Sequence, residues 1–214
     1  RGYETAFQLL HKLRASMVRP DRDRIGGRRP VEADEVLVGG KTRGEGRGVH
    51  HKRYVVGAVE VRTKLNKRGR RSIYAGRLRL RAVDDRGKKS LEPFVTENVE
   101  PHSRVLTDGW RGYENLKALG YSHEAVVLGG DPEKAEQALP MIHLVFSNLK
   151  AWLLGTHHGV SRRHLPAYLN EYVFRFNRRF YPMTAFNSVL GLAAHAVPPS
   201  YAALYSGKWI HPAG

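Results

Sequence analysis

Three short blocks, which follow one another in a fixed order, most constrain how this chain can fold. Residues 31–35 read Val-Glu-Ala-Asp-Glu, residues 105–110 read Val-Leu-Thr-Asp-Gly-Trp, and residues 142–150 begin with Ile-His and end with Asn-Leu-Lys. The first two blocks set a carboxylate, Asp34 or Asp108, within or just beyond an apolar run of β type, whereas the third has helical spacing. Mg²⁺ prefers hard oxygen ligands from separate rigid elements. The blocks therefore predict cations held between a sheet and a helix, in a domain that processes phosphodiesters.

The order of predicted elements indicates an α/β fold. Strands are expected at 31–38, 54–62 and 72–83, then a helix at 90–98, a strand at 104–107, a helix at 110–119, a strand at 124–128, and helices at 132–154, 162–178 and 184–196. Three antiparallel strands followed by αβαβα is the order of an RNase H-like mixed sheet flanked by helices, here with extra C-terminal helices.

Four regions are expected along the chain. They are residues 1–18 as the last helix of an upstream helix-turn-helix-like module, 19–30 as a polar linker, 31–197 as the RNase H-like domain, and 198–214 as a C-terminal tail.

The charge of the chain points to a polyanionic partner. Its 214 residues include 36 Lys and Arg against 20 Asp and Glu, a net charge of +16, which is typical of nucleic-acid binding, with simple solubility as the alternative. Residues 41–90 carry 17 basic and four acidic side chains, whereas residues 91–140 carry four and nine. Acidic residues thus gather where metal ligands are expected, and basic residues flank them.

Several functional classes are disfavoured. The chain has no Cys, so disulfides and Cys-based zinc sites do not arise. The pairs His50-His51 and His157-His158 are poor zinc ligands, because adjacent side chains point apart. No apolar run is long enough to cross a membrane, and the N-terminus lacks a signal-peptide layout. We expect a cytoplasmic, nucleoid-associated protein without a membrane partner.

The two aspartates are the first candidate metal ligands. Asp34 shares one strand face with Glu32, the second candidate, while Glu35 points to the other face. A strand-edge acid paired with a basic residue is the alternative for Asp34. Asp108 follows a strand at the edge where open α/β sheets place ligands, although helix capping would explain it as well.

The third block supplies His143 and Lys150, which lie on the same side of a helix beside its apolar stripe. Pro140 fits the first helical position and places His143 near the N-terminus, where the helix dipole favours the neutral imidazole that binds metal. A hydrogen-bonded boundary histidine is the alternative. Lys150 is expected to contact a phosphate or a base.

Further phosphate contacts are expected from two groups of basic residues. The first lies in a glycine-rich loop without the phosphate-loop motif, and the second at the end of the helix 162–178; solvated surface charge is the alternative for both. They are Lys41, Arg43 and Arg47, and Arg175, Arg178 and Arg179.

Several blocks together resemble a known family. They are Val31–Glu35 followed by Gly39-Gly40, Thr107–Tyr113, Leu153–Ser161 and Phe174–Arg179. In this order, over residues 3–192, the chain resembles bacterial insertion-sequence transposases of the IS1595 family, whose catalytic part is an ISXO2-like DDE domain.

The resemblance implies an RNase H-like fold, two Mg²⁺ or Mn²⁺ ions, and cleavage and transfer of double-stranded DNA at element ends and target, with the protein as a homo-oligomer on DNA. The carboxylate triad carries over to Asp34 and Asp108, and its trailing lysine to Lys150. The third acidic position falls on His143, with Glu136 as a possible substitute ligand. Family members usually carry a zinc ribbon and a helix-turn-helix upstream, so this chain is expected to be a fragment or to lack the end-recognition region.

Two other functions stay open. The chain could be a non-catalytic DNA-binding remnant, which uses residues 41–90 for backbone contact and in which His143 marks decay. It could also be an RNase H-like nuclease that cuts without joining.

Overall fold

The computed structural model describes residues 2–19, 22–39, 52–126, 137–197 and 199–206. These residues form two compact units. We call residues 23–159 the sheet unit and residues 1–22 with 160–214 the helical unit. Each unit is described by itself.

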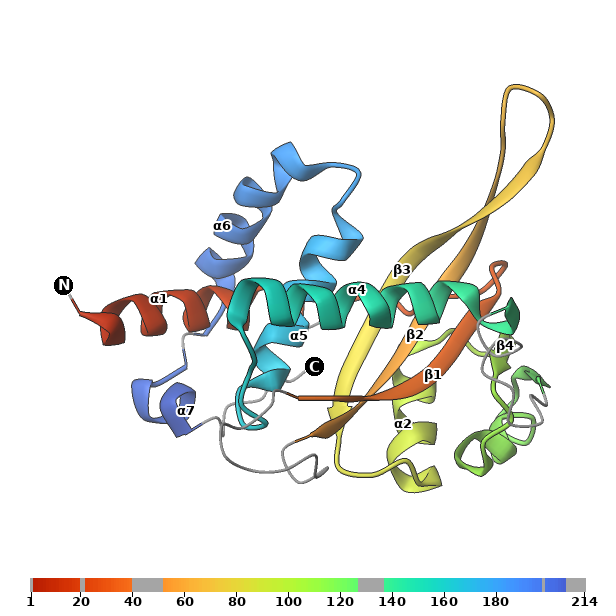
Figure 1. The fold of residues 1–214 in the computed structure, drawn as a ribbon, viewed down its shortest axis with the longest axis horizontal. Helices are drawn as coiled ribbons and strands as arrows, with labels where there is room; N and C mark the ends of the chain where they lie inside the picture. The colour runs from red at the N-terminus through yellow and green to blue at the C-terminus, as the bar shows by residue number, and fades with distance from the viewer. Residues whose placement is uncertain (1, 20–21, 40–51, 127–136, 198, 207–214) are drawn as a thin grey trace. The chain divides into compact units, whose positions relative to one another are not determined.

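The sheet unit contains a five-stranded mixed sheet (Figure 1). In chain order its strands are β1 (Val31–Val38), β2 (Arg53–Leu65), β3 (Arg71–Val83), β4 (Arg104–Thr107) and β5 (Ser122–Ala125). Their order in the sheet is β3-β2-β1-β4-β5; β1, β2 and β3 are antiparallel, whereas β4 runs parallel to both β1 and β5. The expected α/β class and mixed sheet are confirmed.

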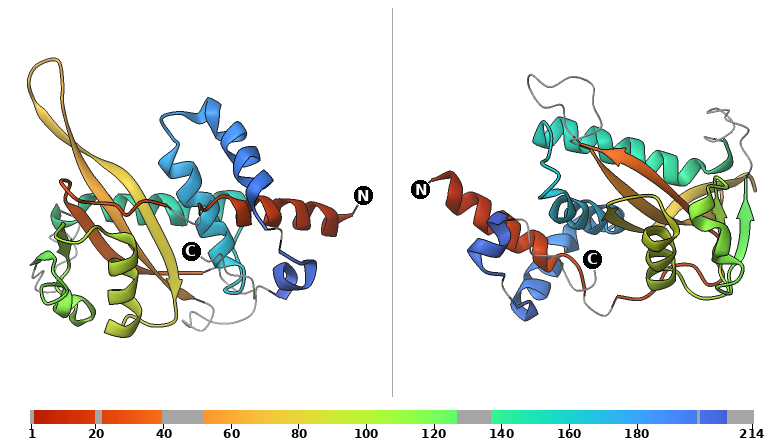
Figure 2. Two further views of the ribbon diagram at one scale, coloured as in Figure 1. Left: turned by 180° about the vertical axis from the view of Figure 1, so that it is seen from behind. Right: turned by 90° about the horizontal axis from the view of Figure 1, so that it is seen from below.

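Helices cover both faces of this sheet (Figure 2). One face carries α2 (Lys88–Asn98) and the 3₁₀ helix η2 (Arg111–Leu116), and the other carries α4 (Pro140–His157). The alternation of β1 explains the two faces, because Val31 and Ala33 are fully buried in the apolar core with α2 and η2. Glu32 and Asp34 therefore point toward α4.

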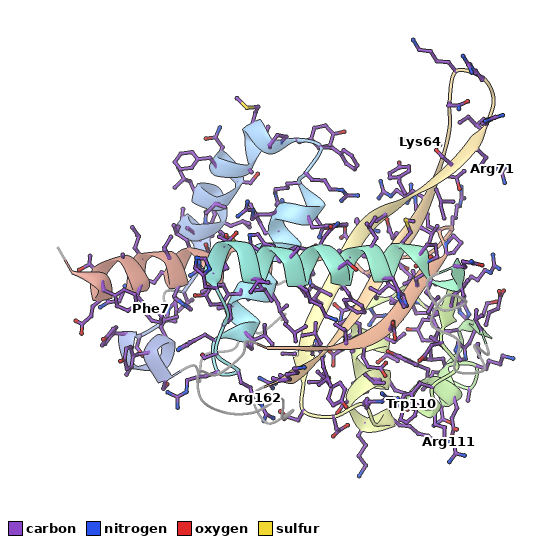
Figure 3. The ribbon with its side chains drawn as sticks, viewed as in Figure 1. Phe7, Lys64, Arg71, Trp110, Arg111 and Arg162 are labelled. Carbon is purple, nitrogen blue, oxygen red and sulfur yellow. The ribbon has the colours of Figure 1, made fainter. Side chains whose placement is uncertain are left out.

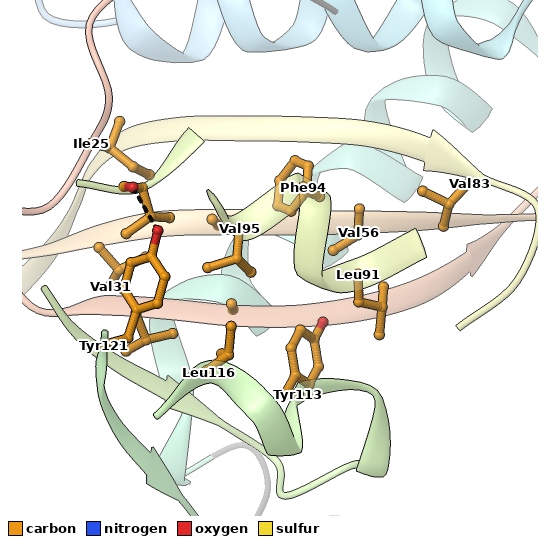
Figure 4. Close-up of a cluster of buried hydrophobic side chains, with 14 residues drawn as sticks. Ile25, Val31, Val56, Val83, Leu91, Phe94, Val95, Tyr113, Leu116 and Tyr121 are labelled. Carbon is orange, nitrogen blue, oxygen red and sulfur yellow. Dashed lines mark hydrogen bonds between the residues drawn. The ribbon is translucent and has the colours of Figure 1, made fainter. Parts of the chain in front are cut away.

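The core beneath α2 and η2 is apolar apart from tyrosine hydroxyls (Figure 4). Phe94 and Leu91 of α2 and Leu116 of η2 are fully buried against the sheet. The hydroxyl of Tyr121 donates to the backbone carbonyl of Val99 at 3.1 Å, so this polar group is satisfied inside the core. Tight packing here fixes the segment that leads into and out of β4.

A glycine lets α4 approach the sheet closely. Gly57 of β2 is the direct neighbour of Asp34 on β1. A Cβ atom at Gly57 would lie 2.9 Å from Ile142 Cδ1 and 3.0 Å from Phe146 Cε1, both on α4. The first turns of α4 therefore rest directly on the strand pair that carries Asp34.

Two predicted helices differ from the structure. Where an α-helix was expected at 110–119, the structure has the short 3₁₀ helix η2 (Arg111–Leu116) followed by a turn. The helix expected at 132–154 is interrupted, since residues 137–138 are helical, Leu139 is not (φ −127°, ψ 55°), and α4 begins at Pro140. Residues 127–136, including Glu136, lie outside the described residues.

The helical unit is built from short helices around its first one. They are α1 (Tyr3–Ser16), α5 (Leu165–Asn177), η3 (Pro182–Thr184), α6 (Ala185–His195) and α7 (Tyr201–Ser206). Arg14 of α1 donates to Glu171 of α5 at 2.8 Å, and its guanidinium lies 4.2 Å from the centre of the Tyr168 ring. The N-terminal helix thus packs in one unit with the C-terminal helices. Among the described residues, no helix has the length and apolarity needed to cross a membrane.

Candidate functional site

The first pair of predicted ligands is in contact. β1 holds Asp34 in the middle of the sheet with 9% of its surface exposed. Its Oδ2 atom lies 3.3 Å from Nε2 of His143, on the first turn of α4, and its Oδ1 accepts the backbone N–H of Glu35 at 2.8 Å. A strand carboxylate and a helical imidazole therefore meet in the space between sheet and helix.

Glu32, the second candidate on this strand face, binds the N-terminal end of α4 instead. Its Oε2 atom accepts the backbone N–H groups of Met141 and Ile142 at 2.8 and 2.9 Å. The first N–H groups of a helix have no partner within the helix, so a buried carboxylate here satisfies two of them. Burial raises the pKa of Glu32 although both hydrogen bonds oppose this shift. Glu32 anchors the turn of α4 that presents His143.

Asp108 is brought beside Asp34 by the parallel pairing of β1 and β4. Glu32 pairs with Leu106, and each aspartate lies two residues further along its own chain segment. Burial raises the pKa of Asp108, and the negative charge of Asp34 raises it further. Asp108 Oδ1 also accepts the backbone N–H of Trp110 at 2.9 Å, so the turn-forming role weighed from the sequence is present as well.

Glu35 is a fourth carboxylate in this region, on the opposite sheet face as predicted. Its side chain is 3% exposed, its Oε2 accepts the hydroxyl of Tyr113 at 3.0 Å, and its Oε1 lies 3.4 Å from Nε of Arg86. Burial, followed by the charges of Asp34 and Asp108, raises the pKa of Glu35 to about 7. Acidic side chains therefore lie close to one another on both faces of the sheet at this point.

Arg86 is a site component that sequence reasoning missed. Its guanidinium lies 3.6 Å from the centre of the Trp110 ring, and its backbone carbonyl accepts the indole N–H of Trp110 at 2.8 Å. Its positive charge favours the ionised forms of both Glu35 and Asp108. In the sequence Arg86 stands in a polar turn, where it reads as a solvated charge, and only the tertiary structure reveals its contact with the loop after β4.

The side-chain atoms gathered here are of the kinds that bind hard divalent cations. Carboxylates of Asp34 and Asp108 are typical ligands for Mg²⁺ and Mn²⁺, and a neutral imidazole such as that of His143 also binds transition metals. Repulsion between the two aspartates is the kind of cost that a bound cation relieves. Within the described ranges, no three His, Asp or Glu side chains converge closely enough to hold one ion. The structure thus supplies a contacting pair, Asp34 and His143, with the carboxylate of Asp108 in electrostatic range of Asp34.

The predicted phosphate-binding residues have separate places. Lys150 is exposed on α4, seven positions after His143 on the same side of the helix. The glycine-rich loop residues Lys41, Arg43 and Arg47 lie outside the described residues.

The three predicted arginines lie at and just after the end of α5 in the helical unit, and each contacts a neighbour there. Arg175 pairs with Glu171 at 3.3 Å, Arg178 lies 3.8 Å from the Phe174 ring centre, and Arg179 lies 4.0 Å from that of Phe176. Such partners are compatible with either phosphate binding or surface packing.

Comparison with known proteins identifies the family. No curated protein and no solved structure matches the chain. The ISXO2-like transposase domain, in contrast, matches residues 25–177, which is more than half of the chain and includes Asp34, Asp108, His143 and Lys150. These residues thus lie in the matched region in the order that the sequence resemblance gave them, and the chain belongs to the family of ISXO2-like transposase domains.

Proposed function

We propose that this chain is the catalytic part of an insertion-sequence DNA transposase, which cuts DNA strands and transfers them in a metal-dependent reaction. The observation that carries the proposal is the contact of Asp34 with His143 between β1 and α4, beside Asp108 on the parallel strand segment. The sheet order β3-β2-β1-β4-β5, with its first three strands antiparallel, supports an RNase H-like arrangement.

Each residue has a defined task in this proposal. Asp34, Asp108 and His143 would hold two Mg²⁺ or Mn²⁺ ions, and ions bound there would supply an activated nucleophile and neutralise charge on the phosphate. Glu32 fixes the first turn of α4, and with it the position of His143. Lys150 contacts a DNA phosphate next to the cut. The substrates are double-stranded element ends and target DNA, and the protein acts as a homo-oligomer on DNA.

Nicking of supercoiled plasmid in Mn²⁺ or Mg²⁺ tests the cleavage step. Asp34→Asn and Asp108→Asn are expected to reduce nicking by at least about a thousandfold while DNA binding persists, because positioned metal ions contribute several kcal/mol to phosphoryl transfer. Asp84→Asn is the matched control, since Asp84 is an exposed carboxylate at the end of β3 that pairs with Arg53 at 3.3 Å. Nicking by Asp34→Asn at the wild-type rate would refute the assignment.

Joining is tested separately from cutting. A labelled oligonucleotide with a free 3′-hydroxyl is incubated with target plasmid, and covalent transfer of the label is measured. A transposase gives both nicked and joined products. A nuclease of similar fold gives nicked products alone.

A non-catalytic DNA-binding remnant is the second candidate. It is favoured by the presence of His143 where the family resemblance places an acid, and by the lack of a three-residue metal group in the described part of the chain. The variant His143→Glu separates the two. An active wild-type protein supports the transposase, whereas activity that appears only in His143→Glu supports the remnant.

A further inference from the structure

The strands β2 and β3 continue well beyond the rest of the sheet. Pairing of β1 with β2 stops at Val31 and Glu60, yet β2 and β3 remain paired out to Leu65 and Arg71. In Figure 1 this part is the orange and yellow ribbon that projects from the sheet. We call residues 61–75 the ribbon arm. It is a two-stranded antiparallel ribbon, which is an element that fits the major groove of B-form DNA.

The tip of the ribbon arm has a defined turn. Asn66 Oδ1 accepts the backbone N–H groups of Arg68 and Arg70 at 2.9 and 2.8 Å, and the N–H of Gly69 donates to the carbonyl of Asn66 at 2.9 Å. Gly69 has φ +73°, which closes the turn as a glycine bulge at little steric cost. Lys67 and Arg68 are therefore held at the outermost point by a turn that needs no partner to order it.

The charge of the arm has one sign. Residues 61–75 contain six basic side chains and no acidic one. Arg62 pairs with buried Glu60 at the base of the arm. The remaining five make no ion pair with any acid in the described part of the chain, and Lys64 and Arg71 are seen on the projecting ribbon in Figure 3. These five are Lys64, Lys67, Arg68, Arg70 and Arg71.

The two faces of the arm differ in chemistry. Cross-strand pairs place Thr63 beside Ile73 and Leu65 beside Arg71 on one face. Leu65 is 68% exposed and Ile73 is 47% exposed, so this face presents apolar groups to solvent. On the other face Lys64 Nζ lies 5.8 Å from the centre of the Tyr74 ring. Apolar and threonine side chains contact thymine methyl groups in the major groove, and flanking cations contact phosphates.

We propose that the ribbon arm enters the major groove of the DNA duplex, with Lys67 and Arg68 at its tip contacting phosphates. This inference rests on the proposed function, since it takes DNA as the partner. Gly57 is the strand neighbour of Asp34, and Asn66 follows it by nine positions along β2 and the turn. At the rise of a β-strand this is a distance of roughly 30 Å. That length is close to one turn of B-DNA. The tip of the ribbon arm therefore contacts the duplex about one helical turn from the phosphate that is cut.

The test compares two double variants with equal charge. Lys67→Gln with Arg68→Gln removes the cations of the tip, and Lys89→Gln with Lys117→Gln removes two exposed cations elsewhere in the sheet unit. Binding of the full chain to a labelled 30-base-pair DNA duplex is measured by fluorescence anisotropy over a series of salt concentrations. Circular dichroism verifies that both variants fold.

The tip variant is expected to bind on the order of tenfold more weakly near physiological salt, with a salt slope smaller by about 2, since each phosphate contact contributes about 0.9. The control variant should retain the wild-type slope. On duplex RNA of the same sequence the two variants should differ little, because the major groove of A-form RNA is too deep and narrow for a ribbon.

Three outcomes would overturn the inference in distinguishable ways. Equal DNA binding by the two variants, in a wild-type protein that binds and nicks DNA, removes the arm from the interface and leaves the proposed function standing. An equal effect of the tip variant on DNA and RNA duplexes refutes groove entry. A wild-type chain that neither binds nor nicks DNA removes the proposed function and the arm together.

Discussion

Replacing Gly57 by Ala perturbs the closest approach of α4 to the sheet. The added Cβ would lie 2.9 Å from Ile142 Cδ1, 2.9 Å from Leu80 Cδ2 and 3.0 Å from Phe146 Cε1. All three separations are well below the roughly 3.5–4.0 Å at which carbon atoms attract one another. Overpacking of this kind costs about 1–3 kcal/mol, so we expect the free energy of unfolding to fall by about 2 kcal/mol.

The same substitution is expected to reduce nicking of DNA. Ile142 precedes His143 on α4, and Gly57 is the strand neighbour of Asp34, so a displaced first turn separates the imidazole from the carboxylate. A shift of about 1 Å at a reacting centre can cost on the order of a hundredfold in rate. Plasmid nicking by Gly57→Ala should therefore fall more than its loss of stability explains.

Gly155→Ala is the matched control for this experiment. Gly155 also lies on α4, but a Cβ there meets no atom within 4 Å. Alanine has the higher helix propensity, so this variant should be unchanged or more stable by up to about 1 kcal/mol. Urea denaturation followed by tryptophan fluorescence measures both variants. If Gly57→Ala matched the wild type in stability and nicking, the close contact would not position the site.

Substitutions at three further residues test individual contacts. The pKa of Glu35 is about 7 in the fold against an ordinary 4.5, so the unfolded chain loses this proton first as the pH rises. The free energy of unfolding should therefore fall by about 3 kcal/mol between pH 4.5 and pH 7, at 1.36 kcal/mol per pH unit. Glu35→Gln should remove most of this decline, as measured by urea denaturation at a series of pH values. An unchanged decline would contradict the raised pKa of Glu35. Glu32→Ala leaves the N–H groups of Met141 and Ile142 without their acceptor and should lower the free energy of unfolding by about 2–3 kcal/mol, as measured by thermal unfolding. Glu32→Gln keeps an acceptor and should lower it less. Equal losses in the two variants would show that these hydrogen bonds do not stabilise α4. Trp110→Leu removes the indole N–H that donates to the Arg86 carbonyl, and should reduce plasmid nicking about tenfold or more with little change in DNA affinity. Nicking at the wild-type rate would exclude a positioning role for Trp110.

Local patterns predicted the strands that carry the site. The bounds of β1 and β4 agree with the expected 31–38 and 104–107, because turn-forming residues flank both strands: Pro30 and Gly39 for β1, and Ser103 and Asp108 for β4. Strand alternation also placed Asp34 and Glu35 on opposite faces, as the contacts with His143 and Tyr113 confirm.

Non-local features could not be predicted in this way. The parallel pairing that aligns Asp34 with Asp108 joins residues far apart in the chain, and no sequence period reports it. The ribbon arm was also missed in part, since the strand expected at 54–62 ends where apolar alternation ends. Beyond that point β2 is held by backbone pairing with β3 and buries few side chains.

The two differences in the helices have local physical causes. Tyr113 and Leu116 are three positions apart, a spacing that suits a 3₁₀ helix as well as an α-helix. Pro140 lacks an N–H and restricts the residue before it, so Leu139 leaves the helical region and α4 starts afresh.

Direct measurement of Mn²⁺ binding shows whether Asp34, Asp108 and His143 form a divalent-cation site. Electron paramagnetic resonance of free Mn²⁺ gives the affinity for the wild-type chain, for Asp34→Asn and for the surface control Asp84→Asn. We expect the wild type and Asp84→Asn to bind Mn²⁺ alike and Asp34→Asn to bind it at least about tenfold more weakly. Equal Mn²⁺ binding by all three proteins would contradict this expectation.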